Sequence, residues 1–182
     1  MVVDVSRQGG HVVWLLDGRP LGEPRLGEDE ALRRAQEFLN RLGYRDMVAT
    51  HAVAERGAQM ITFAARSGRV LLYPDQVKVK VALDDGKVVG FDAVQYLTNH
   101  HERTLPTPRL TPQEARARVS DRLSADSVRL VVIPLAGGRE ALAYEVRGRL
   151  KDTTYLVYIN ALTGEEENIL KAVPTPGGRL LM

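Results

Sequence analysis

The feature that most constrains the fold is a strand, glycine turn and strand pattern that occurs twice. Residues 79–91 (VKVALDDGKVVGF) align without a gap with residues 157–169 (VYINALTGEEENI), and Gly86 falls on Gly164. Glycine readily adopts the positive φ that tight hairpin turns need. Each copy follows a helical pattern and further strand patterns. The sequence therefore predicts an α+β chain of tandem repeats, each a helix packed on an antiparallel β-sheet.

Two helices are predicted. Residues 28–42 carry apolar side chains at three- and four-residue spacings, and Gly43 follows them as an end signal. The second helix opens at residue 111 and is expected to run to Leu123. Its start has Thr111 as N-cap, Pro112 as the first helical residue and Glu114 closing a capping box.

The remaining patterns predict strands. A hairpin is expected over residues 2–16, and further strands over 47–55, 58–65, 69–73, 76–83, 87–93, 127–135, 140–150, 153–160 and 167–173. Residues 174–182 are expected to be irregular. In the hairpin turned by Gly86, a bulged register would set Val79 opposite Phe91 and Val81 opposite Val89, with all four on the buried face.

Three segments follow from this order. Residues 1–26 are expected to be the end of a preceding repeat, residues 27–103 a second repeat, and residues 104–182 a third. The stretch TLPTPRL (104–110) carries two prolines and is predicted to be a linker. The start MVVDVSRQGGH lacks the regions of a signal peptide and enters directly on a strand pattern. We expect the chain to be part of a longer protein.

Composition excludes several classes of site. The chain has no cysteine, which rules out disulfides, thiolate catalysis and cysteine-bound zinc. Its 25 basic and 23 acidic residues are interspersed, so no basic run suited to nucleic acid is present. No phosphate-binding glycine motif and no G-x-S-x-G motif occur. We therefore predict no catalytic, cofactor-binding or metal-binding residues and no enzyme activity.

The adjacent histidines of YLTNHHER (96–103) are the most conspicuous candidates for chemistry. On an extended chain, His100 and His101 project to opposite sides and cannot easily share one ion. We predict instead that Asn99 and His100 make local hydrogen bonds that fix the exit from the repeat. Asp84 and Asp85 resemble an acid/base pair, but their place before Gly86 favours a role in the turn.

A second candidate stretch is LLYPDQ. Tyr73, Pro74 and Asp75 are expected to form a bend between two strands, or alternatively to present an exposed aromatic ring to a partner. Together with Asn99 and His100, these three residues are our candidates for partner binding or for contacts between repeats. The run Glu165–Glu167 is expected to be a solvated strand edge, with cation or basic-partner binding as the alternative.

The stretch YPDQVKVKVALDDGKVVGFDAVQYLTNHHER resembles PepSY domains and, more narrowly, the C-terminal half of the YpeB family of spore-germination proteins. GGHVVWLLDGRP and TYLVYINALTGEEE extend the resemblance over nearly the whole chain. It implies a full-length protein with an N-terminal membrane anchor. It places that protein outside the forespore membrane, in the spore integument at the outer face of the inner membrane. No catalytic residues of the family exist to be carried over.

The resemblance also implies a partner. Members of the family are needed for the stability or localisation of a cortex-lytic transglycosylase, SleB, and restrain it until germination. We therefore expect a non-catalytic interaction module, to which a partner could add a strand at a sheet edge. The alternatives are a PepSY regulator that inhibits a protease, or a cell-wall hydrolase using scattered carboxylates. The sequence leaves the oligomeric state open.

Overall fold

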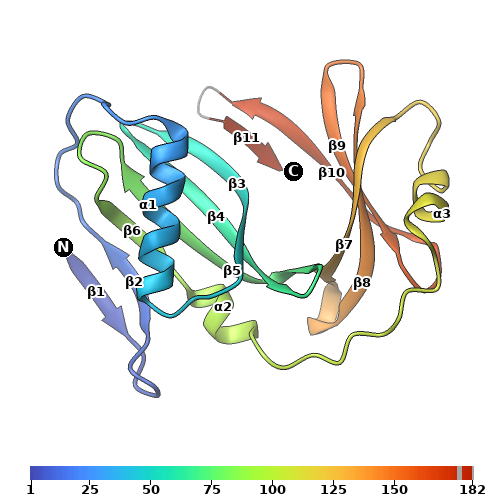
Figure 1. The fold of residues 1–182 in the computed structure, drawn as a ribbon, viewed down its shortest axis with the longest axis horizontal. Coiled ribbons are helices and arrows are strands. Elements are labelled where there is room, and N and C mark those ends of the chain that lie inside the picture. The colour runs from blue at the N-terminus through green and yellow to red at the C-terminus, as the bar shows by residue number, and fades with distance from the viewer. Residues whose placement is uncertain (176–177, 182) are drawn as a thin grey trace. The chain divides into compact units, whose positions relative to one another are not determined.

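The computed structural model describes residues 1–175 and 178–181. Its contacts divide the chain into two compact units. The first holds residues 1–66 and 74–100, and the second holds residues 67–73 and 101–175. The fold is mixed α+β and consists mostly of sheet with a few helices (Figure 1).

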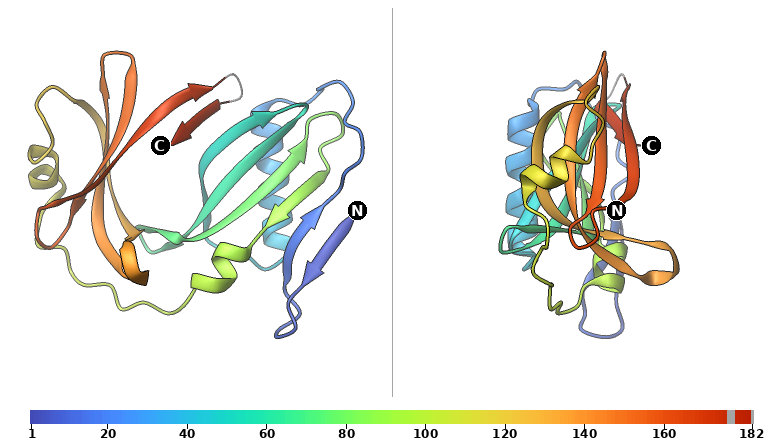
Figure 2. Two further views of the ribbon diagram at one scale, coloured as in Figure 1. Left: turned by 180° about the vertical axis from the view of Figure 1, so that it is seen from behind. Right: turned by 90° about the vertical axis from the view of Figure 1, so that its right-hand side faces the viewer.

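The first unit is a sheet with one long helix on one face. In spatial order its strands are β1 (Val2–Val5), β2 (Val12–Leu16), β6 (Val88–Asp92), β5 (Val70–Ala82), β4 (Ala58–Ser67) and β3 (Met47–Glu55). Helix α1 (Glu28–Arg41) buries Ala31, Ala35 and Leu39, and the side view of Figure 2 shows it on one side of the strands. Phe63 of β4 and Phe91 of β6 are among the side chains of this core.

The second unit is also an antiparallel sheet with a helix. Strands β10 (Glu166–Thr175), β9 (Thr153–Asn160), β8 (Glu140–Leu150) and β7 (Ser124–Pro134) are successive antiparallel neighbours. Helix α3 (Pro112–Ala117) contacts β7 and β8. The turn η1 (Ala136–Gly138) joins β7 to β8, and β11 spans Gly178–Leu181. Leu71 and Leu72, at the start of β5, pair in parallel with Val131 and Val132 of β7.

Three hairpins share one register. In each, the residue pair nearest the turn is followed by a one-residue shift of the ladder. The three sets are Val5–Val12 with Asp4–Trp14, Val81–Val88 with Lys80–Gly90, and Ile159–Glu166 with Tyr158–Asn168. The turns hold Gly10, Gly86 and Gly164 at φ of 65°, 75° and 78°. A bulge therefore sits at the same distance from each glycine.

This register partly confirms the predicted one. Val79 lies opposite Phe91 as expected, but Val81 pairs with Val88 rather than Val89. The reason is that the bulge lies at Val89 and not at the turn. Val79, Val81, Val89 and Phe91 are all buried, so the predicted burial of this hairpin is confirmed.

The first predicted helix is confirmed, and the second is shorter than predicted. The capping box is present: the Glu114 amide donates to Thr111 Oγ1, and the Glu114 carboxylate accepts from the Thr111 amide at 2.7 Å. The helix nevertheless ends at Ala117. Ser120 Oγ accepts from the Arg122 amide, and its carbonyl accepts from the Leu123 amide. These bonds make a local turn that competes with the helix.

Two further expectations were wrong. Strand β5 is continuous, so Tyr73 and Pro74 lie within one strand rather than in a bend between two. Residues 94–99, for which no element was predicted, form the short helix α2 (Val94–Asn99). The end of the chain is not irregular where it is described, because β10 reaches Thr175 and β11 begins at Gly178; residues 176, 177 and 182 lie outside the described residues.

Candidate functional site

Four of the candidate residues form a small cluster in the first unit. Asn99 Nδ2 donates to the carbonyl oxygen of Pro74 at 3.1 Å. His100 Nδ1 lies 2.6 Å from Asp75 Oδ2, and Asp75 is fully buried. These contacts join the end of α2 to β5, 25 residues earlier in the chain. Asn99 and His100 therefore form hydrogen bonds as predicted, but their partners lie on β5 and are not local in the sequence.

Aromatic rings extend this cluster. The His100 ring is stacked on Tyr96 at 4.4 Å between centroids, and Tyr96 meets Tyr44 edge to face at 4.9 Å. Burial, and secondarily Tyr96, raises the pKa of the Tyr44 phenol to about 12. The phenol is therefore neutral at physiological pH. Uncharged rings and one bonded histidine indicate a packing role for this end of the unit.

Tyr73 belongs to a different cluster, in the second unit. Its hydroxyl donates to Glu145 Oε2 at 2.6 Å, and the Tyr158 hydroxyl donates to the same oxygen at 3.0 Å. Arg129 Nε donates to Glu145 Oε1 at 2.7 Å, and Arg129 Nη2 donates to the Tyr73 hydroxyl at 2.7 Å. Glu145 is only 2% exposed. Tyr73 is thus a bonded, partly buried ring and not an exposed aromatic.

The polar groups of this cluster are hydrogen-bonded to one another. Burial, and then the Glu145 carboxylate, raises the pKa of the phenols of both Tyr73 and Tyr158 above the ordinary value. Both phenols therefore keep their protons and act as donors. Glu145 accepts from three side chains, which leaves it poorly placed to take a proton from a substrate.

The two aspartates of the Gly86 turn are also bonded internally. Arg19 donates to both carboxylate oxygens of Asp84 at 2.8 Å and to Asp85 at 2.7 Å. The Gly22 amide donates to Asp84 at 2.7 Å. Hydrogen bonds from Arg19 and Gly22 hold the pKa of Asp84 well below its usual value. The turn role predicted for Asp84 and Asp85 is confirmed, with Arg19 as a partner that the sequence did not indicate.

Replacing Asp84 with asparagine should therefore have a pH-dependent effect. The folded-state pKa lies below the unfolded value of 3.8, so the Arg19–Asp84 pair stabilises the fold above about pH 4 and is lost as the pH falls further. We expect Asp84→Asn to be less stable than the unsubstituted chain at pH 7 and the difference to shrink toward pH 2. Urea unfolding at several pH values measures this, with the exposed Asp4→Asn as control. A difference that does not change with pH would contradict the assignment.

Two of the four histidines, His11 and His100, line one small pocket of the first unit, whereas His51 lies in β3 and His101 follows α2. Among the described residues, no group of three or more His, Asp or Glu side chains is placed to hold a metal ion. The described residues also include no helix with the length and apolar character needed to cross a bilayer.

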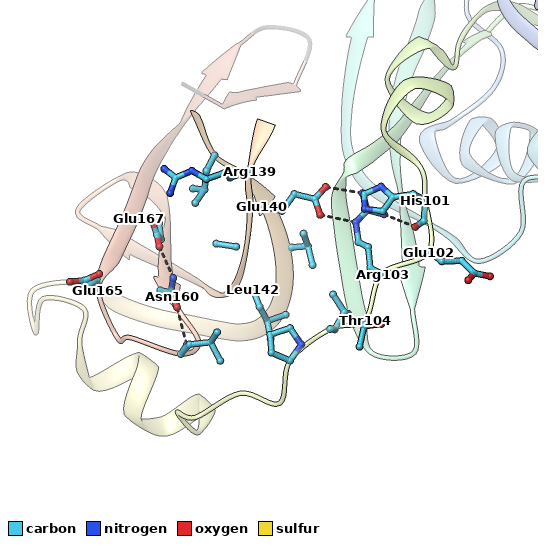
Figure 3. A pocket seen from close by; sticks show the side chains of 16 residues that line it. His101, Glu102, Arg103, Thr104, Arg139, Glu140, Leu142, Asn160, Glu165 and Glu167 are labelled. Atoms are coloured by element: carbon cyan, nitrogen blue, oxygen red, sulfur yellow. Dashed lines mark hydrogen bonds and ion pairs between the residues drawn. The ribbon is translucent and has the colours of Figure 1, made fainter. Parts of the chain in front are cut away.

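A polar pocket with a volume of about 710 Å³ lies in the second unit (Figure 3). Residues 101–106 form one wall, and β7, β8 and β9 contribute others. Arg103 donates to both oxygens of Glu140 at 2.7 and 2.8 Å, and Asn160 donates to Glu167 at 2.6 Å. The pocket is lined by residues of both charges, among them Arg139 and Glu165.

Sequence reasoning missed this pocket and the Glu145 cluster. Glu145 carried a usable signal, since it is the one charged residue inside the apolar run ALAYEV of β8. A charge in such a run implies a buried partner. Its actual partners lie 13, 16 and 72 residues away, which no local pattern connects.

Comparisons with known proteins agree along the chain. Residues 1–106 match the family described as YpeB sporulation, PepSY1 and PepSY2 domains, and residues 109–170 match the PepSY family, described as peptidase propeptide and YPEB domain. The chain is 39% identical over 169 residues to the sporulation protein YpeB of Halalkalibacterium halodurans and 33% identical over 171 residues to that of Bacillus subtilis. Each match covers 93% of this chain and 38% of the relative's length.

A solved structure is similar as well. The Bacillus megaterium YpeB C-terminal domain superposes with a TM-score of 0.85 at 30% identity, covering 94% of this chain and 76% of that one. The fold described above is therefore that of the YpeB C-terminal domain.

Proposed function

The chain belongs to the YpeB sporulation family, and on that premise we propose that it is a non-catalytic module that stabilises a spore cortex-lytic transglycosylase, SleB, and restrains it until germination. The observation that carries the proposal is the family match, which spans both units. The longer protein would be anchored at the outer face of the spore inner membrane by a segment outside this chain.

The bonding of the buried acids supports a non-catalytic role. Glu145 is held by Arg129 and two tyrosines, and Asp75 is paired with His100. A general acid or base must face its substrate with a free position. Side chains engaged in this way stabilise the fold instead.

We also propose that the chain is a row of PepSY-like repeats, with residues 1–26 as the end of one, 27–103 as the next and 104–182 as the third. The shared hairpin register supports this, since all three glycine turns carry a bulge at the same distance. The order β6-β5-β4-β3 matches β10-β9-β8-β7 in space, and each set follows a helix.

Contacts around two of the turns support the same proposal. Leu83 donates its amide to the Gly57 carbonyl and accepts from the Leu26 amide, just before α1. Ala161 occupies the matching place: it donates to the Leu142 carbonyl and accepts from the Leu110 amide, just before α3. A Cβ atom added to Gly86 would first meet the side chain of Leu26, and one added to Gly164 would first meet that of Leu110.

We propose that the candidate residues hold in place the segments that connect one repeat to the next. Pro74, Asp75, Asn99 and His100 bond one another within the first unit. Tyr73 bonds within the second. For partner contact we propose the polar pocket of the second unit. Residues 101–106 form one wall of this pocket, and its charged side chains, such as Arg139 and Glu165, would bind a polar segment.

The direct test is binding of the purified chain to the cognate transglycosylase, followed by sedimentation and a cortex-digestion assay. We expect association and slower release of muropeptides from cortex. Arg139→Glu, in the pocket, should weaken association several-fold, whereas Arg149→Glu, exposed on the same unit but outside the pocket, should not. Absence of association between two folded proteins would contradict the proposal, and muropeptide release by this chain alone would support the hydrolase alternative.

One observation favours a second candidate. The family that matches residues 109–170 is described as including peptidase propeptides. A regulator of a peptidase would lower that enzyme's activity when the two are incubated together. If a spore protease is inhibited while the transglycosylase is neither bound nor slowed, this second function is the better account.

A further inference from the structure

The segments that lead into α1 and α3 have matching sequences. Residues 19–26 (RPLGEPRL) and 103–110 (RTLPTPRL) share arginine, leucine, proline, arginine and leucine at the same places. The first arginine of each segment donates two hydrogen bonds to a carboxylate of its own unit. The acceptor of Arg19 is Asp84, and the acceptor of Arg103 is Glu140. Because these two acids lie on different elements, the two units differ at this end of the sheet.

In the first unit the segment lies directly on a short turn. Strands β3 and β4 are joined by Arg56 and Gly57 alone. A Cβ atom added to Gly57 would meet the Leu21 side chain at 3.4 Å. The Gly22 amide is bonded to the Asp84 carboxylate at 2.7 Å. The contacts of this segment are therefore supplied by its own unit.

The second unit has a longer connection at the same place. Leu142 stands where Gly57 does, because its carbonyl likewise accepts from the amide of the residue that begins the glycine turn. Residues 132–142 thus replace the two-residue turn, extending β7 and β8 and passing through η1. Glu140, the partner of Arg103, belongs to this extension. We call residues 132–142 the β7–β8 extension.

The hydrogen bond that fixes the segment in the first unit has no counterpart in the second. By position relative to the turn glycines, Leu162 takes the place of Asp84, and by the matching segments Pro106 takes that of Gly22. Proline has no amide hydrogen to donate, and a leucine side chain has no acceptor. The polar pocket of about 710 Å³ lies here, between the linker and the β7–β8 extension (Figure 3).

The pocket combines a buried apolar floor with a charged rim. Val132, Ala141 and Leu142 line it and are all buried. Arg139 and Glu165 line it and are exposed. Ligand pockets commonly pair apolar walls with a few polar groups that fix orientation. This lining suits a polar chain that carries one apolar side chain.

The linker wall offers main-chain hydrogen bonds. The amides of Leu105 and Thr107 have no partner in the described part of the chain. Both residues precede a proline, which favours an extended backbone. In an extended chain these two amides point to one edge, and Pro106 and Pro108, which have no amide hydrogen, point to the other. The linker can therefore pair with an added strand along one edge only.

We propose that the polar pocket of the second unit binds an extended polypeptide segment of the partner. The segment pairs with the linker at Leu105 and Thr107, and one of its apolar side chains lies on the floor of Val132, Ala141 and Leu142. The β7–β8 extension makes the second unit the binding unit, because the first has a two-residue turn in its place. This inference rests on the proposed function, since it states how the partner is held.

The first test is an NMR titration of the whole chain with acetyl-Ser-Thr-Leu-Thr-Ser-amide. We expect saturable shifts and slower exchange of the Leu105 and Thr107 amides, and shifts of the Val132 and Leu142 methyl groups, with a Kd on the order of 1 mM. The same peptide with N-methylated amides should bind about tenfold more weakly, because it cannot donate to the linker. Equal binding of the two peptides would overturn the strand pairing.

Variants test the edge and the extension. Thr107→Pro removes one of the two donors from a linker that already carries prolines, and it should weaken peptide binding about tenfold. Thr104→Pro, whose amide points to the opposite edge, is the matched control and should leave the affinity unchanged. Replacing the β7–β8 extension with Arg-Gly, the turn of β3 and β4, should abolish binding. Equal effects of Thr107→Pro and Thr104→Pro would contradict the proposed edge.

Binding of the transglycosylase separates this inference from the proposed function. We expect it to bind the unsubstituted chain and to bind Thr107→Pro several-fold more weakly. If it binds the chain and Thr107→Pro equally, the inference fails while the proposed function stands. If the peptide binds as expected but the transglycosylase does not, the proposed function fails and the pocket remains a site for extended peptides.

Discussion

Replacing Glu145 with alanine is expected to lower the free energy of unfolding of the second unit by about 2–3 kcal/mol, because Arg129 loses its charge-assisted hydrogen bond to a buried carboxylate. The hydroxyls of Tyr73 and Tyr158 lose their acceptor in the same change. Urea unfolding combined with amide exchange along β8 measures the loss. Exchange is needed because it reports the second unit separately from the first.

Two control variants sharpen this prediction. Glu145→Gln keeps an acceptor for the tyrosines and removes only the charge, so a smaller loss than that of alanine is expected. Glu166→Ala, exposed on β10, should change the stability by no more than about 0.5 kcal/mol. If Glu145→Ala behaves like Glu166→Ala, the buried cluster does not stabilise the unit and its description as structural is wrong.

Replacing Asp75 with alanine is expected to lower the stability of the first unit by about 2–3 kcal/mol, because a fully buried carboxylate is lost together with its bond to His100. The His100 ring should then move off Tyr96, on which it is stacked. Ring chemical shifts of His100 and amide exchange in α2 record the two effects.

Asp75→Asn is the matched control for this change. It preserves the shape and one acceptor oxygen, so the ring of His100 should stay close to its place while part of the stability is lost. An unchanged His100 signal in Asp75→Ala would show that Asn99 and the α2 backbone alone hold the end of this helix.

Much of the fold could be predicted because its signals are local. The helix over residues 28–41 follows from its apolar spacing and from Gly43. The boundaries of β3, β8 and β9 agree with the predicted runs, since each run is bounded by turn residues. The positive φ of Gly86 and Gly164 was expected because few other residues adopt it without strain.

The wrong predictions have two physical causes. Some contacts join residues that are distant in the sequence, and some local interactions compete with the predicted element. Pro74 looked like a break, yet β5 passes through it, and its carbonyl is bonded by Asn99 from α2 instead. The start of α2 has only a weak local signal, because Asp92 accepts from the Val94 amide two residues later, as in an Asx turn.

The candidate site was the least predictable part. The bonds of Asn99 and His100 were foreseen, but their partners on β5 were not. Arg19 reaches Asp84 across 65 residues, and Tyr73 reaches Glu145 across 72. Such pairs exist only once the sheet has assembled, so the sequence alone gives the residue types and not their partners.

The common bulge of the three hairpins has a consequence for how such chains change over time. On the repeat organisation that we propose, duplication of such a segment would add a strand pair whose inward-facing and outward-facing residues are already in phase, because the turn and the bulge fix the register.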